Sequence, residues 1–253
     1  MPRTSSKTLT DFSVPVDAIE EEFNRIMRTK AQLGDLRYIF KIALNNMSLF
    51  PNINLVEGAT YKDYIERWIH GYNEALINLP SSRTASPKSS CSDPAIKTIV
   101  QYVTKVNGDE AKKQSNYHNL FMSAENIQGN LLEEYIAKVV RPYGWLWCNG
   151  NVLRAVDFCT VDGSALLQIK NKSNTENSSS SAIRTGTTIQ KWYRLGTKTR
   201  KGVPLPDYKW ESLNAIINDH VSGHAADCNM TEESYNAFLR NVATRNPRII
   251  TYR

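Results

Sequence analysis

The sequence predicts an α/β fold in which a helical N-terminal part precedes a core of strands and helices. Two observations support this class. Apolar residues recur at helical spacing through roughly the first 80 residues, and two short apolar runs flank a tight turn at Asp162-Gly163 in the second half. The length of 253 residues is enough to bury a full core, and 41% apolar with 22% charged residues is typical of a globular protein.

Three helices are expected in the N-terminal part, over residues 17–33, 35–50 and 61–79. Asp17 is a candidate N-cap of the first helix. The apolar stripes of these helices are most simply the faces that pack into a core. A stretch rich in Ser and Pro, residues 80–94, then reads as a loop. We therefore expect a helical N-terminal subdomain over residues 1–93 and a second part over residues 94–253.

The second part is expected to begin with a short helix over residues 95–106, whereas the polar stretch 107–119 has no clear assignment. A helix with a Ser cap follows from Ser123 and ends before Pro142. Short β-like runs come next, then a polar loop and more helix from Ala182. A helix, three strands and another helix indicate an α/β domain.

The geometry of the hairpin follows from its turn. Asp162-Gly163 between two apolar runs favours a two-residue type I′ turn. Counting outward from it places Phe158 opposite Leu167 and Asp157 opposite Gln168. Directly opposed residues of antiparallel strands project to the same face of the sheet. A carboxylate and an amide oxygen are therefore expected on one face of the hairpin.

Lys170 lies two residues beyond Gln168 and shares that face, because side chains alternate along a strand. Mg²⁺ prefers oxygen ligands, so Asp157 and Gln168 could hold it while the Lys170 ammonium offsets charge on a phosphate. This chemistry suggests phosphodiester hydrolysis. The alternative is an ordinary hairpin with one polar, solvated face.

Composition favours a polyanionic partner and gives no indication of a disulfide-rich, zinc-ribbon or membrane protein. The net charge of +6 and a pI of about 9.1 point first to nucleic acid. The four cysteines show no CxxC spacing, so neither a disulfide framework nor a zinc ribbon is indicated. The first residues lack the apolar region of a signal peptide, and no apolar run approaches membrane-spanning length. We expect a cytoplasmic protein.

Three segments carry a resemblance: "SAENIQGNLLEEYIA", "VDFC" and "LLQIKNKSNTENSSSSAIRTGTTIQKW". Asp157 followed by Gln168-Ile-Lys170 resembles the nuclease core of the PD-(D/E)xK superfamily in its Q-x-K variant, a mixed central sheet flanked by helices. More specifically, the segments resemble the SinI-type group of type II restriction endonucleases, which cut GGWCC-like sites. The resemblance covers about residues 123–192.

The resemblance implies that Asp157 is the central metal ligand, Gln168 the second ligand and Lys170 the catalytic lysine. Ala155-Val156 stands where the superfamily often has a Pro, and Gln168 replaces an acidic ligand, which leaves the metal affinity open.

The superfamily often adds a glutamate from the helix before the hairpin, and Glu133 fits that pattern as a third catalytic and metal-binding residue. Glu134 and Glu125 remain alternatives. Glu125 falls on the apolar face of the expected helix, where an unpaired carboxylate is unfavourable.

The loop that follows Lys170 would lie over DNA, which makes its Asn and Arg side chains candidate contacts to phosphates and base edges. The candidates are Asn171, Asn174, Asn177 and Arg184. The resemblance further implies Mg²⁺, double-stranded DNA, a homodimer suited to a nearly palindromic target, and a cognate DNA methyltransferase. The alternatives are a repair or junction nuclease of the same superfamily, and a DNA-binding module without catalysis.

Overall fold

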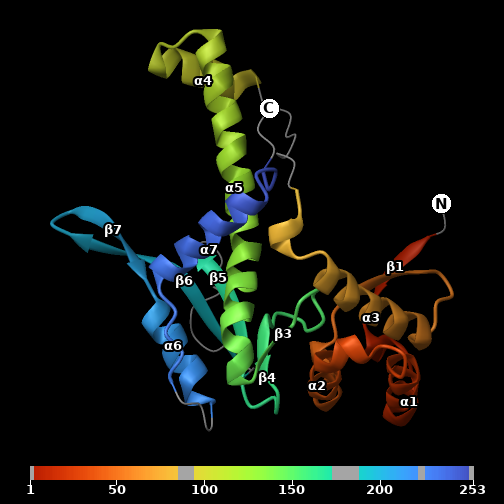
Figure 1. Cartoon of the computed structure of the whole chain (residues 1–253). Helices are drawn as coiled ribbons and strands as arrows, with labels where there is room; N and C mark the ends of the chain where they lie inside the picture. Colours follow the sequence, from red (N-terminus) through yellow and green to blue (C-terminus); the bar gives the residue numbers. More distant parts are fainter. Residues whose placement is uncertain (1–2, 85–93, 173–187, 222–225, 251–253) are drawn as a thin grey trace. The chain divides into compact units, whose positions relative to one another are not determined.

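The computed structural model describes residues 3–84, 94–172, 188–221 and 226–250 (Figure 1). The chain forms two compact units. The first, here called the sheet unit, combines Met1–Asn78 with Tyr135–Glu232, and the second, the helical unit, combines Leu79–Glu134 with Glu233–Arg253. This division differs from the expected boundary after residue 93, because the N-terminal helices share one hydrophobic core with the strands.

The N-terminal part of the sheet unit holds the three helices that the sequence predicts: α1 (Val16–Met27), α2 (Gly34–Asn45) and α3 (Tyr61–Ile77). Two short strands, β1 (Thr4–Lys7) and β2 (Ile53–Val56), pair in antiparallel fashion beside them. Helix α3 begins at a capping box, in which the Asp63 carboxylate accepts a hydrogen bond of 2.7 Å from the Thr60 backbone N–H.

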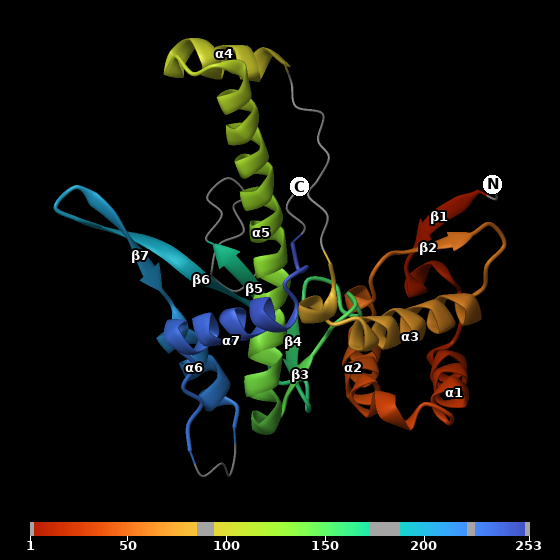
Figure 2. The ribbon, with the colours of Figure 1, turned by 45° about the horizontal axis from the view of Figure 1, so that its top comes forward.

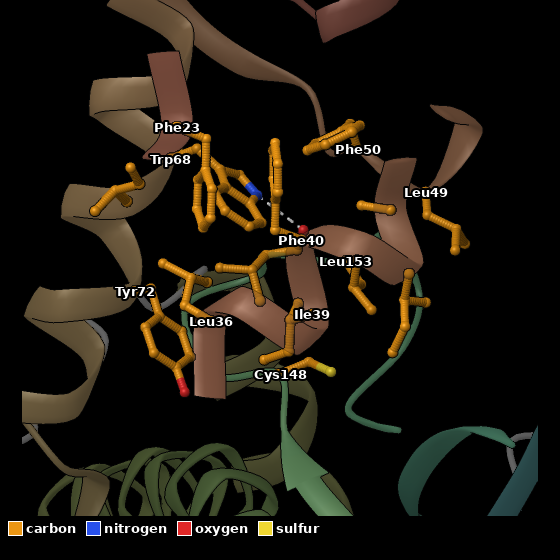
Figure 3. Packing of buried hydrophobic residues seen from close by; sticks show 14 of the residues in the cluster. Phe23, Leu36, Ile39, Phe40, Leu49, Phe50, Trp68, Tyr72, Cys148 and Leu153 are labelled. Atoms are coloured by element: carbon orange, nitrogen blue, oxygen red, sulfur yellow. Dashed lines mark hydrogen bonds between the residues drawn. The ribbon is translucent and has the colours of Figure 1, made fainter. Parts of the chain in front are cut away.

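Aromatic side chains fill the core between these helices (Figure 3). The rings of Phe23 and Phe40 stack with centroids 3.7 Å apart, and Phe50 meets Trp68 edge to face. The indole N–H of Trp68 donates a hydrogen bond of 2.9 Å to the Val152 carbonyl, in the segment that leads to the predicted hairpin. The helices are therefore joined directly to the part of the chain that carries the candidate site.

Within the described residues, five further strands form one mixed sheet in the order β3-β4-β5-β6-β7. All neighbours are antiparallel except β5 and β6, which are parallel. The strands are β3 (Trp145–Trp147), β4 (Phe158–Thr160), β5 (Leu166–Lys172), β6 (Ile189–Arg200) and β7 (Val203–Tyr208). The α/β class is confirmed.

The prediction of helix after residue 182 is wrong from Ile189 onward, where the chain forms β6. The pairing that stabilises this strand is with β5, which is separated from it by residues 173–187, and these lie outside the described part of the chain. Because the pairing strand is distant in sequence, the residues around Ile189 do not by themselves indicate a strand.

The two faces of the sheet are covered differently. Cys159, Leu166 and Ile189 lie in register and belong to the core shared with the N-terminal helices, so we call their side the N-terminal face. The opposite side packs on α6 (Trp210–Asp219) and is called the α6 face; there the rings of Trp192 and Trp210 lie 5.4 Å apart. Alternation along each strand assigns every side chain to one face or the other.

The hairpin register is confirmed, but its turn is not type I′. Phe158 pairs with Leu167 as expected, and Gly163 has a φ of +74°, whereas Asp162 does not adopt a positive φ. The Thr160 N–H bonds to the Ala165 carbonyl at 3.1 Å, so the loop spans residues 161–164. Because one residue is added on each side of the turn, the register stays the same.

Gly163 also explains how α2 approaches the hairpin. A Cβ atom at this position would lie 2.9 Å from Cγ1 of Ile42. A larger residue would force the Ile42 side chain to shift, in addition to the strain of its positive φ.

The helical unit contains α4 (Pro94–Thr104), most of α5 (Gly108–Val140) and most of α7 (Glu232–Arg245). Helix α4 matches the prediction. Helix α5 is longer than expected because it includes the unassigned polar stretch, and Ser123 therefore lies inside it, where its hydroxyl donates to the Asn119 carbonyl at 2.9 Å. In the part of the chain with described placement, no helix is both long and apolar enough to cross a membrane.

Candidate active site

Asp157 immediately precedes β4 and is half-buried. Its backbone N–H donates to the Leu167 carbonyl at 2.9 Å, although Phe158 is the residue that pairs with Leu167. Two residues thus oppose one, which is the arrangement of a β-bulge. Two positions before, Ala155 has a φ of +61°, an unusual conformation for alanine. The chain is bent where it presents the carboxylate, a feature often found beside active sites.

The carboxylate of Asp157 is attached to the neighbouring strand. Its Oδ2 accepts a hydrogen bond of 2.6 Å from the backbone N–H of Ile169. Asp157 and Gln168 therefore do not pair as expected, because the bulge ends the backbone pairing of β4 at Phe158. The Asp157 carboxylate, in place of a backbone carbonyl, accepts the hydrogen bond from Ile169. Within the described residues, the second carboxylate oxygen accepts no hydrogen bond.

Burial raises the pKa of Asp157 above its ordinary value, while the Ile169 hydrogen bond and the Lys170 charge oppose that increase. The molecule thus holds a carboxylate where water solvates it poorly. Such a group gains more than a solvated one from a bound cation.

The side-chain oxygen of Gln168 is buried and has no hydrogen-bond partner in the part of the chain that the structure describes. The Oε1 atom of Gln190 shares this property, but alternation places Gln190 on the α6 face, away from Gln168. A buried acceptor without a partner costs about 1–3 kcal/mol, so Gln168 fits a position that a ligand completes.

The donor set fits a hard divalent cation. Asp157 and Gln168 offer a carboxylate and an amide oxygen, the ligand types that Mg²⁺ takes together with several waters and substrate phosphate. Among the described residues no group of three or more His, Cys, Asp or Glu side chains could hold a metal ion, so these strands do not form an all-protein cage.

Two lysines lie on the same side of these strands. Lys170 is exposed on β5 and stands in register with Tyr193 of β6. Lys191, which is not among the site residues that the sequence predicts, is only 7% exposed and stands in register with Gln168. Its position in the "IQKW" segment was part of the family resemblance, but its nearness to Gln168 depends on the parallel pairing of β5 with β6.

The three candidate glutamates all lie on α5 in the helical unit. Glu133 is half-buried. Glu134 is 1% exposed, and its carboxylate accepts hydrogen bonds of 2.7 and 2.6 Å from the backbone N–H and the hydroxyl of Ser81. Glu125 is exposed and lines an apolar groove together with residues of α7. The hydrogen bonds to Ser81 give the buried Glu134 a structural role.

Of the four residues expected to contact DNA, the structure describes Asn171. Asn171 lies on the α6 face, and its side-chain oxygen accepts a hydrogen bond of 3.0 Å from Nε of Arg194. Arg194 is itself 4% exposed and forms an ion pair of 2.6 Å with Glu232. Asn171 thus orients a buried arginine. Asn174, Asn177 and Arg184 lie outside the described residues.

Sequence comparison shows which known enzymes this chain is similar to. The family model described as SinI restriction endonuclease matches residues 69–237, well beyond the segments quoted above. The type II restriction enzyme Eco47I of Escherichia coli is 31% identical over 213 residues, which cover 80% of this chain and 85% of that enzyme. The type II restriction enzyme SinI of Salmonella infantis is 38% identical over 136 residues, 52% of this chain and 57% of that enzyme.

The class is therefore that of the type II restriction endonucleases, which are site-specific deoxyribonucleases. Within this class, the chain belongs to the SinI restriction endonuclease family. Enzymes of this class act on double-stranded DNA and generally use divalent metal ions.

Proposed function

We propose that this enzyme hydrolyses phosphodiester bonds of double-stranded DNA with Mg²⁺, using a nuclease core of the PD-(D/E)xK type in its Q-x-K variant. The hydrogen bond between the Asp157 carboxylate and the Ile169 N–H supports the proposal most directly, since Ile169 lies between Gln168 and Lys170. The bond joins Asp157, the first residue of the motif, to the segment that carries Gln168 and Lys170.

Asp157 and Gln168 would hold the cation through the carboxylate oxygen that lacks a hydrogen bond and the buried amide oxygen. The resemblance adds Glu133 as a further ligand. When bound, the cation supplies charge that polarises the scissile phosphate and lowers the pKa of a coordinated water. Asp157 is held in place by Ile169 before substrate arrives, so little reorganisation is needed at the moment of reaction.

Lys170 places an ammonium beside these oxygens, on the strand that carries Gln168. We propose that it orients the attacking water and offsets the negative charge that develops on the phosphate. The alternative role, a phosphate contact without catalysis, predicts binding but no cutting when the residue is intact.

The remaining parts of the proposal concern partners. A nearly palindromic site is cut most simply by a homodimer with one active site for each strand. We propose Asn174, Asn177 and Arg184 as DNA contacts, and Asn171 as a residue that positions the Arg194 side chain. A cognate DNA methyltransferase would protect the host, and both proteins would work in the cytoplasm, where that DNA is found.

The proposal is tested by incubating the purified protein and its Lys170→Ala variant with unmethylated phage DNA, in Mg²⁺ and in EDTA. We expect discrete fragments with one shared end sequence, absent in EDTA and with the variant. Cutting without a shared end sequence would favour a repair nuclease. Tight binding without any cutting by the intact protein would favour a binding module and contradict the catalytic proposal.

A further inference from the structure

The outer halves of β6 and β7 form a hairpin that projects beyond strands β3 to β5 (Figure 2). Residues 197–206 of this hairpin, here called the basic arm, are almost all exposed. They include Lys198, Arg200 and Lys201 and contain no acidic residue. An exposed element with only positive charge is the electrostatic footprint expected for contact with nucleic acid.

The charges of the arm are not neutralised by the protein. Arg200 and Lys201 form no ion pair with any residue that the structure describes. The nearby Asp207 is already paired with Lys209, whose hydrogen bond is the main cause of its lowered pKa, with a smaller contribution from the charge of Lys198. Charges left free in this way remain available to phosphate groups.

The turn of the arm keeps a lysine at its tip despite a backbone penalty. Lys201 has a φ of +50° and Gly202 a φ of +78°, and Arg200 pairs with Val203 across them. This is a two-residue turn of the type that favours Asn-Gly or Gly-Gly, because positive φ is unfavourable for lysine. The sequence therefore places charge where turn propensity alone would not.

The edge of the arm is unsuited to pairing with another strand. Strand β7 is the outer strand of the sheet, and Pro204 and Pro206 remove backbone donors from it while it remains paired with β6. Proline at such positions protects a sheet edge from added strands. The chemistry of the arm thus favours a polyanion over a peptide that would extend the sheet.

The base of the arm is anchored to the catalytic strands. Strand β6 continues from Lys191 beside Gln168 to Arg200 at the tip, and Arg194 is fixed between them by Asn171 and Glu232. Arg200 lies seven residues beyond Tyr193, the register partner of Lys170, which corresponds to roughly 23 Å of strand at about 3.3 Å per residue. This is a reach of about seven base pairs of B-DNA.

We propose that the basic arm is a second DNA-binding element, in which Arg200 and Lys201 contact backbone phosphates several base pairs from the bond that is cut. A two-stranded ribbon is narrow enough to lie along or within the major groove. The inference rests on the proposed function, because it takes double-stranded DNA as the substrate. It adds a contact surface remote from Asp157 and Lys170.

The test compares Arg200→Gln/Lys201→Gln with Arg28→Gln/Lys41→Gln, a control that removes the same two charges from exposed positions just after α1 and on α2. Binding is measured by fluorescence anisotropy in EDTA over a range of KCl concentrations. Two duplexes of equal length are used, one with the cleavage site found above and one with it scrambled. Thermal melting confirms that both variants are folded.

We expect the slope of log Kd against log salt to decrease by about 1.8 in the arm variant, on both duplexes, and to change little in the control. A slope equal to that of the control, with wild-type protein that binds and cuts, would overturn the arm proposal alone. A loss confined to the site-bearing duplex would overturn phosphate contact in favour of base reading. Absence of binding by the wild type would instead contradict the proposed function itself.

Discussion

The Asp157 carboxylate accepts a hydrogen bond of 2.6 Å from the backbone N–H of Ile169, the residue between Gln168 and Lys170. This bond fixes the relative positions of three side chains that come from two strands. It also uses only one of the two carboxylate oxygens, so the other remains for a ligand. Four predictions can be tested by substituting single residues.

The first concerns the stability of the protein without metal. The pKa of Asp157 is raised by burial, so the folded state favours the protonated form and loses stability as the pH rises from the unfolded-state pKa through the folded-state pKa. Asp157→Asn keeps an acceptor for Ile169 without the charge. We expect it to abolish cleavage yet raise the Tm at pH 8 by a few degrees, with little change at acidic pH.

Asp162→Asn is the matched control for calorimetry. Hydrogen bonds from Thr160 and Ser164 lower the pKa of Asp162 to about 2, so its contribution to stability is present above the unfolded-state pKa and is lost as pH falls toward 2. The Asn variant should therefore have a lower Tm at pH 8, the opposite sign. Equal signs for the two variants would contradict the desolvation argument.

The second prediction concerns Gln168. Gln168→Leu removes a buried oxygen that lacks a partner, which should stabilise the metal-free protein by about 1–3 kcal/mol and abolish stabilisation by Mg²⁺. Gln168→Glu should bind Mg²⁺ more tightly than the wild type, because it adds a second carboxylate. Isothermal titration and melting with and without Mg²⁺ measure both effects. An unchanged response of the Leu variant to Mg²⁺ would remove Gln168 from the metal site.

The third prediction concerns Lys191, which is buried in register with Gln168. Lys191→Met preserves length and apolar contacts but removes the ammonium. We expect single-turnover cleavage to fall by at least about 100-fold, the scale of one electrostatic contact to the transition state, with Kd for DNA within a fewfold of wild type. Lys198→Met, which removes a charge at an exposed position, should weaken DNA binding and leave the single-turnover cleavage rate nearly unchanged.

The fourth prediction separates the two adjacent glutamates. Glu134→Ala leaves the N–H and hydroxyl of the half-buried Ser81 without their acceptor, so we expect a Tm lower by several degrees and cleavage retained at low temperature. Glu133→Ala should lose cleavage even at a temperature where it is folded. Melting curves and cleavage at a temperature where both variants are folded decide between these roles.

The sequence predicts most strongly what local patterns encode. Helices α1 to α3 follow from apolar stripes, and the β4–β5 register follows from the position of Gly163 even though the turn type is wrong, because a loop widened equally on both sides preserves the pairing. Asp157, Gln168 and Lys170 could be selected because polar residues interrupt apolar runs.

Other features have no local signal. The first half of α5 has no regular apolar stripe, so the polar stretch after Asn107 could not be assigned. Strand β6 ends in an exposed basic segment and pairs with β5 across a long connection, so neither its type nor the approach of Lys191 to Gln168 could be read from neighbouring residues. The bulge at Asp157 also depends on tertiary packing, since Ala155 is a poor residue for its own conformation.

The shared core of the sheet unit has a consequence for synthesis on the ribosome. The buried residues of α2 and α3 belong to the same core as Leu146, Leu166 and Ile189 and are made first, whereas the strands that complete this core come after the whole of Leu79–Glu134. At roughly 5–20 residues per second, this apolar surface stays bare in the nascent chain for several seconds. During that interval the exposed surface is prone to aggregation, and no nuclease activity can arise before the strands that carry Gln168 and Lys170 have been made.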